Sequence, residues 1–463
     1  MSQLILLSFV MFAAWLIRRD TARREGVSGA VWIPTLWVGI IASRPISTWL
    51  GLGGGGADYE YSLEGSPADR LFFFVMIVAA LIVLLRRRVA WGFIFRKNWP
   101  IFLFYTYFLV SVVWSDSPLP SFKRWFKDFG NIFVALVILT EANPGQAFRA
   151  VFVRCAYVLL PLSVIFIRYF PDLGRVYLRS GAMEVTGVTF QKNSLGALVL
   201  VCGIVLIWDW LERSRPDSVR QNRFDRYLVI AIAAIGAWLL YLSDSKTSMA
   251  CLAVGGLILA ATRLPFLRSR VAALGVYVVA GTVVFFVLDW AFGISAGLVS
   301  SMGRDMTFTG RTDVWNALLA LKTDPIFGTG FCSFWSDEHF RSRLPDWVAF
   351  SAHNGYLETY LDGGWVGIFF LAVMLIAVGL KINRQLAVAG NDALIRFAVL
   401  VAIIIGSFSE SHFARMGPLW FLFLLSALDT PAARHEPVAS DLAAPAAPRP
   451  VEFAGSASWR SPR

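Results

Sequence analysis

Long apolar runs separated by short charged segments dominate this chain from residue 3 to residue 428. A helix that crosses a bilayer needs about 20 apolar residues, within a range of about 17 to 25. On that measure the sequence predicts an all-α polytopic membrane protein with about 12 to 13 transmembrane helices. The candidate spans, of which the fifth and the last are short, are 3–17, 31–50, 70–85, 99–114, 129–141, 151–170, 194–210, 227–243, 247–262, 271–292, 363–380, 393–409 and 416–428.

The composition agrees with a membrane protein and argues against other classes. Hydrophobic residues make up 57% of the 463 residues and charged residues only 16%, which is more apolar than a soluble domain. The net charge of +11 does not indicate a nucleic-acid partner, because the basic residues lie in short loops between apolar runs. The four cysteines have no zinc-like spacing, and three of them, Cys155, Cys202 and Cys251, lie inside apolar runs.

The charges of the loops predict which side of the membrane each loop occupies. Loops on the cytoplasmic side carry an excess of Lys and Arg, which assigns the segments 18–24, 86–97, 213–226, 263–270 and 381–396 to the cytoplasm. The loops near 51–69, 171–193, 244–246, 293–362 and 410–415 then lie outside. The segment 115–128 also lies outside, and it fits the rule less well because it holds Lys123, Arg124 and Lys127.

This layout divides the chain into five segments. An N-terminal transmembrane bundle is expected over residues 1–180, and central transmembrane helices with short polar external turns over 181–292. A large external loop spans 293–362, and its aromatic residues suggest that it folds against the membrane surface. C-terminal transmembrane helices follow over 363–428. The tail 429–463 is rich in Pro, Ala and Ser, which predicts a disordered cytoplasmic segment.

The most concentrated polar stretch lies at the edge of an apolar run, over residues 351–367. His353 is followed by Glu358 and Asp362, which are four apart and share one helical face. A neutral imidazole beside carboxylates is suited to general-base chemistry near pH 7, although a lone histidine near a helix start is more often a packed or capped residue. Tyr356, on another face, is suited to stacking on a sugar ring.

Three other polar positions outside the membrane have both a functional and a structural interpretation. Arg311 comes at an expected helix start, where an anion is favoured, but it could equally pair with Asp313 or a lipid phosphate. Lys246 lies among hydroxyl groups in a tight external turn, and a lysine at such a boundary more often extends to the interface. Lys192 and Asn193 could contact phosphate or sugar, or only cap a helix.

The usual motifs for nucleotide, hydrolase and metal chemistry are missing from the sequence. No Gly-Lys-Ser/Thr ending follows the glycines at 51–56, no Gly-x-Ser-x-Gly elbow occurs between a strand and a helix, and no spaced His, Cys and Asp set suggests a metal. The remaining external polar segment, between the last two spans, holds Glu410 and His412.

The pair His353-Asn354, followed after nine residues by Gly364-Trp-Val-Gly367, resembles the signature of the O-antigen ligase / Wzy polymerase superfamily. The arrangement of many spans with one large external loop before this motif also resembles that superfamily. Arg311 in Thr-Gly-Arg-Thr-Asp-Val-Trp and Lys246 in Ser-Asp-Ser-Lys-Thr-Ser match two further family positions. The resemblance covers roughly residues 185–430. The residues in these motifs are most similar to those of the exopolysaccharide-production (ExoQ-like) branch.

The resemblance implies an inverting, metal-independent glycosyltransferase of the GT-C type that needs no cofactor. It would act on undecaprenyl-diphosphate-linked glycans at the periplasmic face of the bacterial inner membrane, and its partners would be a glycan donor, a glycan acceptor, the lipid bilayer and other exopolysaccharide assembly proteins. The family's histidine corresponds to His353 as the catalytic residue, and its loop arginine corresponds to Arg311 as a diphosphate ligand. A second diphosphate-binding arginine of the family is Lys246 here, which keeps the charge but loses bidentate geometry. Substrate-binding or supporting roles are expected for Lys192, Asn193, Asn354, Tyr356, Glu358, Asp362, Glu410 and His412.

Three functions remain open from the sequence. The first is a polymerase that joins lipid-linked repeat units into an exopolysaccharide. The second is a ligase that moves a finished glycan to lipid A core or another acceptor. The third is a lipid-linked glycan flippase or other transporter, for which charges within spans would be expected; Arg44, Arg154, Arg168 and Asp289 are of that kind.

Overall fold

The structure is a computed structural model, and it describes residues 1–52, 66–177, 181–214, 223–263, 311–345, 351–386 and 391–431 together with residues 270, 273, 275 and 348. Within these residues the chain is helical apart from one small hairpin, which confirms the predicted all-α class. The elements up to the hairpin are α1 Ser2–Ala22, η1 Gly29–Val31, α2 Trp32–Ile41, α3 Ile46–Trp49, α4 Pro67–Arg86, α5 Trp91–Lys97, α6 Trp99–Ser111, η3 Val112–Trp114, α7 Pro118–Leu139, α8 Pro144–Tyr169, α9 Pro171–Gly174, β1 Arg175–Tyr177 and β2 Met183–Val185. They are followed by α10 Lys192–Arg213, α11 Arg223–Ser243, α12 Lys246–Ala260, η4 Ala261–Arg263, α16 Arg311–Leu319, η6 Phe334–Ser336, α17 Glu338–Arg341, α18 Gly355–Leu386, α19 Asn391–Gly406 and α20 Pro418–Ala427.

Local sequence signals explain where several of these helices begin. A proline occupies the first position of α4, α7, α8 and α20, where its missing N–H would have had no helical partner. Ser66 caps α4 by accepting from the N–H of Ala68, and Asn143 caps α8 by accepting from the N–H of Gln146. The antiparallel hairpin pairs Arg175 with Val185 and precedes α10.

Five helices among the described residues are long and apolar enough to cross a membrane, namely α4, α8, α10, α11 and α18. Four further apolar helical segments are shorter: Gly29–Ile41, Trp99–Trp114, Lys246–Ala260 and Pro418–Ala427. The expected span 31–50 is interrupted, because α2 ends at Ile41 and Pro45 precedes α3. Most of the expected span 271–292, much of the loop 293–362 and the tail beyond residue 431 lie outside the described residues.

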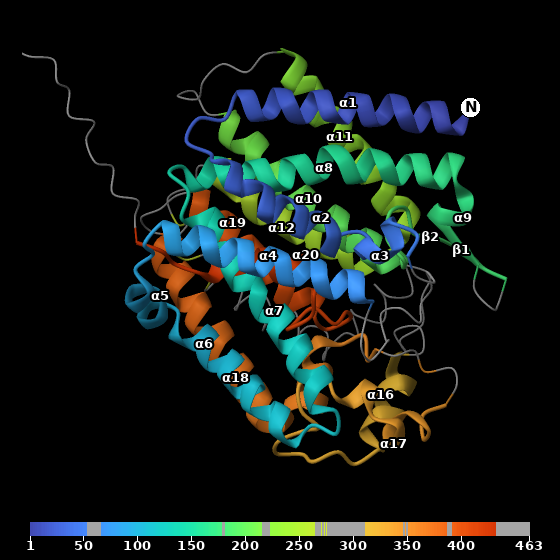
Figure 1. Cartoon of the computed structure of the whole chain (residues 1–463), viewed down its shortest axis with the longest axis vertical. Coiled ribbons are helices and arrows are strands. Elements are labelled where there is room, and N and C mark those ends of the chain that lie inside the picture. The colour runs from blue at the N-terminus through green and yellow to red at the C-terminus, as the bar shows by residue number, and fades with distance from the viewer. Residues whose placement is uncertain are drawn as a thin grey trace, which may run out of the picture. The chain divides into compact units, whose positions relative to one another are not determined.

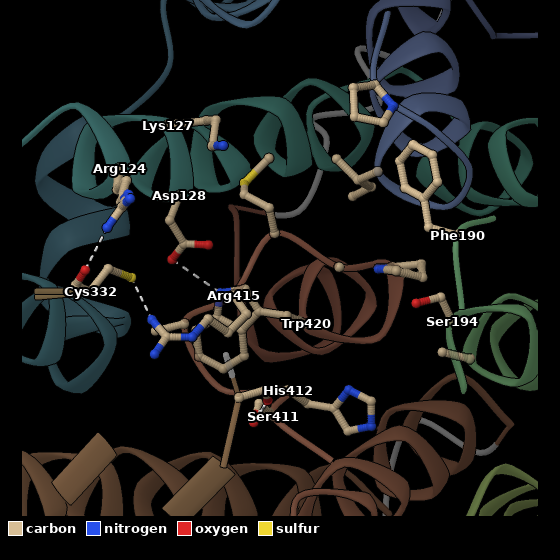
Figure 2. Close-up of a pocket in the computed structure, with 18 of the residues that line it drawn as sticks. Arg124, Lys127, Asp128, Phe190, Ser194, Cys332, Ser411, His412, Arg415 and Trp420 are labelled. Atoms are coloured by element: carbon tan, nitrogen blue, oxygen red, sulfur yellow. Dashed lines mark hydrogen bonds between the residues drawn. The ribbon is translucent and has the colours of Figure 1, made fainter. Parts of the chain in front are cut away.

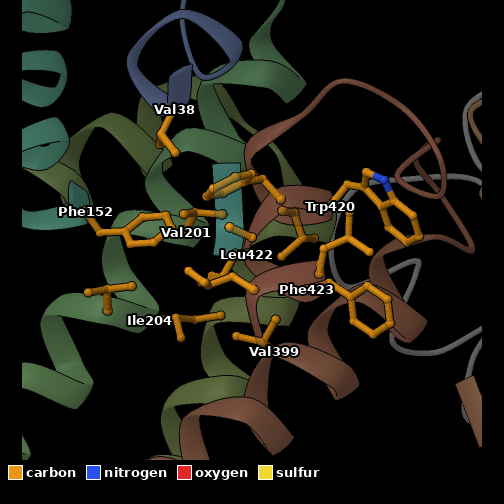
Figure 3. Packing of buried hydrophobic residues seen from close by; sticks show 14 of the residues in the cluster. Val38, Phe152, Val201, Ile204, Val399, Trp420, Leu422 and Phe423 are labelled. Atoms are coloured by element: carbon orange, nitrogen blue, oxygen red, sulfur yellow. The ribbon is translucent and has the colours of Figure 1, made fainter. Parts of the chain in front are cut away.

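The hydrophobic core is centred on α20, in which every residue is buried. Side chains from α2, α8, α10 and α19 pack toward it, as Figure 3 shows for Val38, Phe152, Val201, Ile204, Val399, Trp420, Leu422 and Phe423. By contrast, α1 buries only Ala13 and Leu16, and the second half of α18 exposes large apolar side chains such as Trp365 and Phe369. Exposed apolar faces of this kind are stable in lipid and not in water.

Helix α18 is broken at Gly364, and the break fixes the loop that precedes this helix. Gly364 has φ +59° and ψ −161°, a conformation that is essentially restricted to glycine. The N–H groups that the break frees are satisfied by the loop: Trp365 donates to the carbonyl of Pro325 at 2.9 Å and Val366 donates to that of Ile326 at 3.1 Å. Since α18 also packs along α6 (Figure 1), the break ties the loop to the helical bundle.

Candidate functional site

The turn between α19 and α20, residues 407–417, contacts the first residues of four other described helices. We call it the 407–417 turn. The residues that bond to this turn come from the starts of α10, α12, α16 and α18 and are Asn193, Thr247, Arg311 and Gly355. The N-terminal end of a helix carries partial positive charge. The turn therefore gathers four positive helix ends around its own acidic residue, Glu410.

Glu410 connects three of the residues that the sequence had singled out. Its Oε1 accepts from Arg311 Nη2 at 2.7 Å and from Asn193 Nδ2 at 2.7 Å. Its Oε2 lies 3.4 Å from His353 Nδ1. Arg311 also donates to the backbone carbonyl of Ser409. The structure thus brings His353 and Arg311 together through one carboxylate.

The charge state of Glu410 follows from these contacts. Burial alone would raise the pKa of its carboxyl group, but the hydrogen bond with His353 and the charge of Arg311 outweigh burial and lower that pKa. Nearby, burial lowers the pKa of the His412 imidazole, with a partial offset from Glu410. At neutral pH, Glu410 is therefore an anion and His412 is neutral.

His353 has an unusual backbone conformation. Its φ is +47°, a left-handed value that is uncommon for a non-glycine residue and is concentrated at functional sites. The backbone N–H of His353 donates to Ser351 Oγ at 3.1 Å, and that hydroxyl in turn lies 3.4 Å from Glu358 Oε1. The surrounding hydrogen bonds hold this turn, and 26% of the His353 side chain stays exposed.

Glu358 and Asp362 share one helical face as expected, but they bind Arg415 and not the imidazole. Arg415 Nη2 lies 2.9 Å from Glu358 Oε2 and 2.9 Å from Asp362 Oδ2. Glu358 also accepts from the N–H of Ala352 at 2.8 Å. These bonds join α18 to the 407–417 turn and to the segment before His353, and the carboxylate beside the imidazole is Glu410.

The two lysines of the predicted site have other partners. Lys246 Nζ lies 2.8 Å from Asp244, and both side chains are substantially exposed. Lys192 Nζ lies 2.8 Å from Glu184 of the hairpin. The structure therefore does not bring Lys246 into contact with His353 or Arg311, although the next residue, Thr247, bonds to the turn.

Asn354 and Tyr356 have structural contacts. Asn354 Oδ1 accepts from the N–H groups of Tyr356 at 3.0 Å and Leu357 at 3.1 Å, which caps the start of α18. The Tyr356 hydroxyl donates to the carbonyl of Ile404, and its ring packs against Phe413. The ring expected to stack on a sugar is thus engaged in joining α18 to α19.

A cavity of about 460 Å³ lies against this cluster, and His353, Glu410, His412 and Asn193 contribute to its lining. Figure 2 shows its opposite sides, with Arg124, Lys127 and Asp128 of α7 facing Ser411, His412 and Arg415 of the turn. Sequence reasoning assigned no role to the α7 residues or to Arg415. The sequence did contain one indication for α7: its three cations lie in a segment expected outside. We used it above only as a poor fit to the rule that Lys and Arg favour the cytoplasmic side.

Two of the charged residues that favoured a transporter are part of the packing. Arg154 Nε lies 2.8 Å from Asp20, and its side chain is 3% exposed. Arg44 donates to the backbone carbonyls of Leu173 and Thr189 beside the hairpin. Asp289 lies outside the described residues.

Two comparisons with known proteins match this chain. Residues 230–372 match the model of the family described as O-Antigen ligase. The chain is also 23% identical over 328 residues to the exopolysaccharide production protein ExoQ of Rhizobium meliloti (strain 1021), in an alignment that covers 67% of this chain and 71% of that protein. The matched segment includes Lys246, Arg311, His353 and the break at Gly364.

Proposed function

We propose, on the premise that this chain is a member of the O-antigen ligase / Wzy polymerase superfamily, that it is a GT-C-like glycosyltransferase of a bacterial inner membrane with its active site on the periplasmic face. Its substrates are undecaprenyl-diphosphate-linked oligosaccharide repeat units, which it polymerises into an exopolysaccharide. The observation that carries this proposal is the cluster of His353, Glu410 and Arg311 at the edge of a cavity.

His353 acts as the general base in this proposal. With its Nδ1–H directed at the Glu410 carboxylate, Nε2 is left as the acceptor for the proton of a sugar hydroxyl. The hydroxyl oxygen attacks the anomeric carbon, its proton passes to Nε2, and the bond from that carbon to the diphosphate oxygen breaks. The electron pair leaves with the diphosphate, and attack from the face opposite the leaving group inverts the anomeric centre.

Arg311 supports the leaving group. Its guanidinium is anchored by Glu410 and the Ser409 carbonyl, so its position is set before substrate binds, and the remaining N–H groups can donate to phosphate oxygens. Asn193 bonds to the same carboxylate oxygen as Arg311 and holds the start of α10 at the site. Since a diphosphate leaves without further activation, the reaction requires no nucleotide and, in this proposal, no metal.

A ligase is the second candidate, and the matched family's description favours it, whereas the name of the relative favours exopolysaccharide assembly. Deleting the gene separates the two. Single repeat units without polymer support the polymerase, and intact polymer that stays on its lipid carrier supports the ligase. If the protein were a flippase, deleting the gene would instead leave lipid-linked units on the cytoplasmic face.

The direct test uses purified protein in lipid nanodiscs with lipid-linked repeat units, and it follows glycan length by mass spectrometry. His353→Gln should abolish elongation, whereas His339→Gln, at an exposed histidine of α17, serves as the matched control. Elongation by His353→Gln at the wild-type rate would reject His353 as the base. Activity that survives chelation with EDTA supports the metal-independent reaction, and the anomeric configuration of the product, read by NMR, tests inversion.

A further inference from the structure

The first half of α7 places two lysines, Lys123 and Lys127, on the wall of the cavity that His353 and Glu410 also line. The two residues are four apart, so they lie on one face of the helix, where like charges repel each other. Both side chains are half-buried. A pair of this kind is unfavourable unless an anion neutralises it.

Neither lysine makes a direct ion pair with a carboxylate in the described part of the chain. No carboxylate there lies within 4.0 Å of either lysine, and Lys127 Nζ instead lies 5.3 Å from the centre of the Phe73 ring. Two of the acidic residues that line the same cavity are neutralised by arginines, Glu358 by Arg415 and Glu410 by Arg311. Asp69 and Asp128 bond to the hydroxyls of Ser47 and Tyr105 and act on Lys127 only from beyond 4.0 Å.

Arg124, between the two lysines, holds α7 in place against the external loop. It donates to the carbonyl of Cys332 at 2.6 Å and to the hydroxyl of Ser336 (Figure 2 shows the first of these bonds). The lysines are therefore presented on a helix that is bonded to the loop at two residues that line the cavity, Cys332 and Ser336. Fixed cations on a cavity wall are pre-organised for an anionic ligand.

The charge distribution along the chain points the same way. Short external loops of a membrane protein are depleted in Lys and Arg, because positive charge favours the cytoplasmic side. The segment 115–128 carries three cations and is nevertheless expected outside. Arg311 and Lys246, the cations expected to hold phosphate, already have carboxylate partners at 2.7 and 2.8 Å.

We propose that Lys123 and Lys127 form a phosphoryl-binding subsite on the α7 wall of the cavity, and that this subsite holds the diphosphate of the lipid-linked substrate in addition to Arg311. This inference rests on the proposed function for the identity of the substrate. Lysine ammonium groups bind phosphate as point charges, and a cavity of about 460 Å³ is within the size range of small-molecule sites. Other aromatic side chains that line the cavity, including Phe73 and Phe190, suit the apolar and sugar parts of the same molecule.

The test is a binding measurement without acceptor or turnover, so its outcome is independent of the proposed reaction. Wild-type protein in nanodiscs is titrated with farnesyl diphosphate and with farnesol, at low and high salt. We expect the affinity for farnesyl diphosphate to fall about 10-fold in Lys123→Gln or Lys127→Gln and about 100-fold in the double variant. Binding of farnesol should not change, and the double variant should lose most of the salt dependence.

Two controls make the result decisive. Lys322→Gln removes an exposed cation from the external loop and should leave the affinity unchanged. The Lys123→Arg, Lys127→Arg double variant keeps both charges and should retain affinity within about 3-fold, which excludes misfolding of α7 as the cause. Competition by inorganic diphosphate that weakens in the double Gln variant as much as the binding of farnesyl diphosphate supports recognition of the head group. Competition that keeps its wild-type strength there overturns the proposal. Wild-type affinity for farnesyl diphosphate in the double Gln variant would overturn it as well.

Discussion

Replacing Glu410 with Gln is the sharpest test of the site, because the change keeps the shape of the side chain and removes its charge. An amide has one acceptor and one donor end. If the oxygen stays with Arg311 and Asn193, the NH₂ group faces His353 Nδ1 and donates to it. That bond favours the tautomer in which Nε2 carries the proton, and Nε2 can then no longer accept one.

The size of the effect follows from the geometry. General-base catalysis contributes about 10² to 10⁴-fold in rate, and the 3.4 Å separation between His353 Nδ1 and Glu410 Oε2 is long for a hydrogen bond. We therefore expect the lower end, about 100-fold slower transfer, which corresponds to about 2.7 kcal/mol. Stability should fall by about 2 kcal/mol, less than for a fully buried pair, because the Arg311 and Glu410 side chains are 16% and 14% exposed.

The assay is elongation of lipid-linked repeat units by purified protein, with melting temperature measured in the same detergent. Glu338→Gln is the matched control, since Glu338 is an exposed carboxylate of α17 in the same external loop. It should change neither rate nor stability. A Glu410→Gln variant that transfers at more than about a third of the wild-type rate would refute the coupling between Glu410 and His353.

Three further predictions concern the break in α18, the external lysine and the buried histidine. Gly364→Ala should cost about 3 kcal/mol or more, because φ is +59° and the added Cβ would collide with the carbonyl of Ile326; an unchanged melting temperature would contradict this. Lys246→Gln should change stability by less than about 1 kcal/mol and leave the KM for donor within about 3-fold, because the lysine pairs with exposed Asp244; a KM raised 10-fold would instead establish Lys246 as a diphosphate ligand. Since burial lowers the pKa of His412 below its usual 6.5, the unfolded chain binds a proton that the folded chain does not, so stability is complete above pH 6.5 and falls as the pH drops below it. Melting temperatures between pH 7.5 and 5 should therefore decline less steeply in His412→Gln than in the wild type.

The helical layout was accessible from the sequence because apolar runs record burial directly, whether in lipid or in protein. The runs at 151–170 and 194–210 correspond to α8 and α10, which extend a few residues further at their starts. The short run at 416–428 was ambiguous. In the structure α20 is surrounded by other helices, which accounts for a helix of uniformly apolar residues that is too short to span a bilayer alone.

The candidate site was only partly accessible, for a physical reason. His353 and Asn193 were identified as polar residues near span ends, and Arg311 at a helix start in the large loop. The carboxylate that joins them is 57 residues from the histidine and 99 from the arginine. Sequence spacing identifies neighbours on one helix, so it pointed to Glu358 or Asp362 as the carboxylate beside His353. Only the tertiary packing of the 407–417 turn shows that Glu410 occupies that position.

The joining of the external loop to the broken helix has a consequence for how the protein is made. Residues 325 and 326 leave the ribosome before residues 365 and 366, whose N–H groups they accept. Glu410 is 99 residues after Arg311. At a translation rate of about 5–20 residues per second, it is synthesised about 5 to 20 seconds later. During that interval the half-buried arginine has no counter-ion from the turn, and α20 has not yet filled the centre of the bundle. The site therefore cannot form before the 407–417 turn is synthesised, and a nascent chain that stalls before residue 407 would leave Arg311 without Glu410 as its counter-ion.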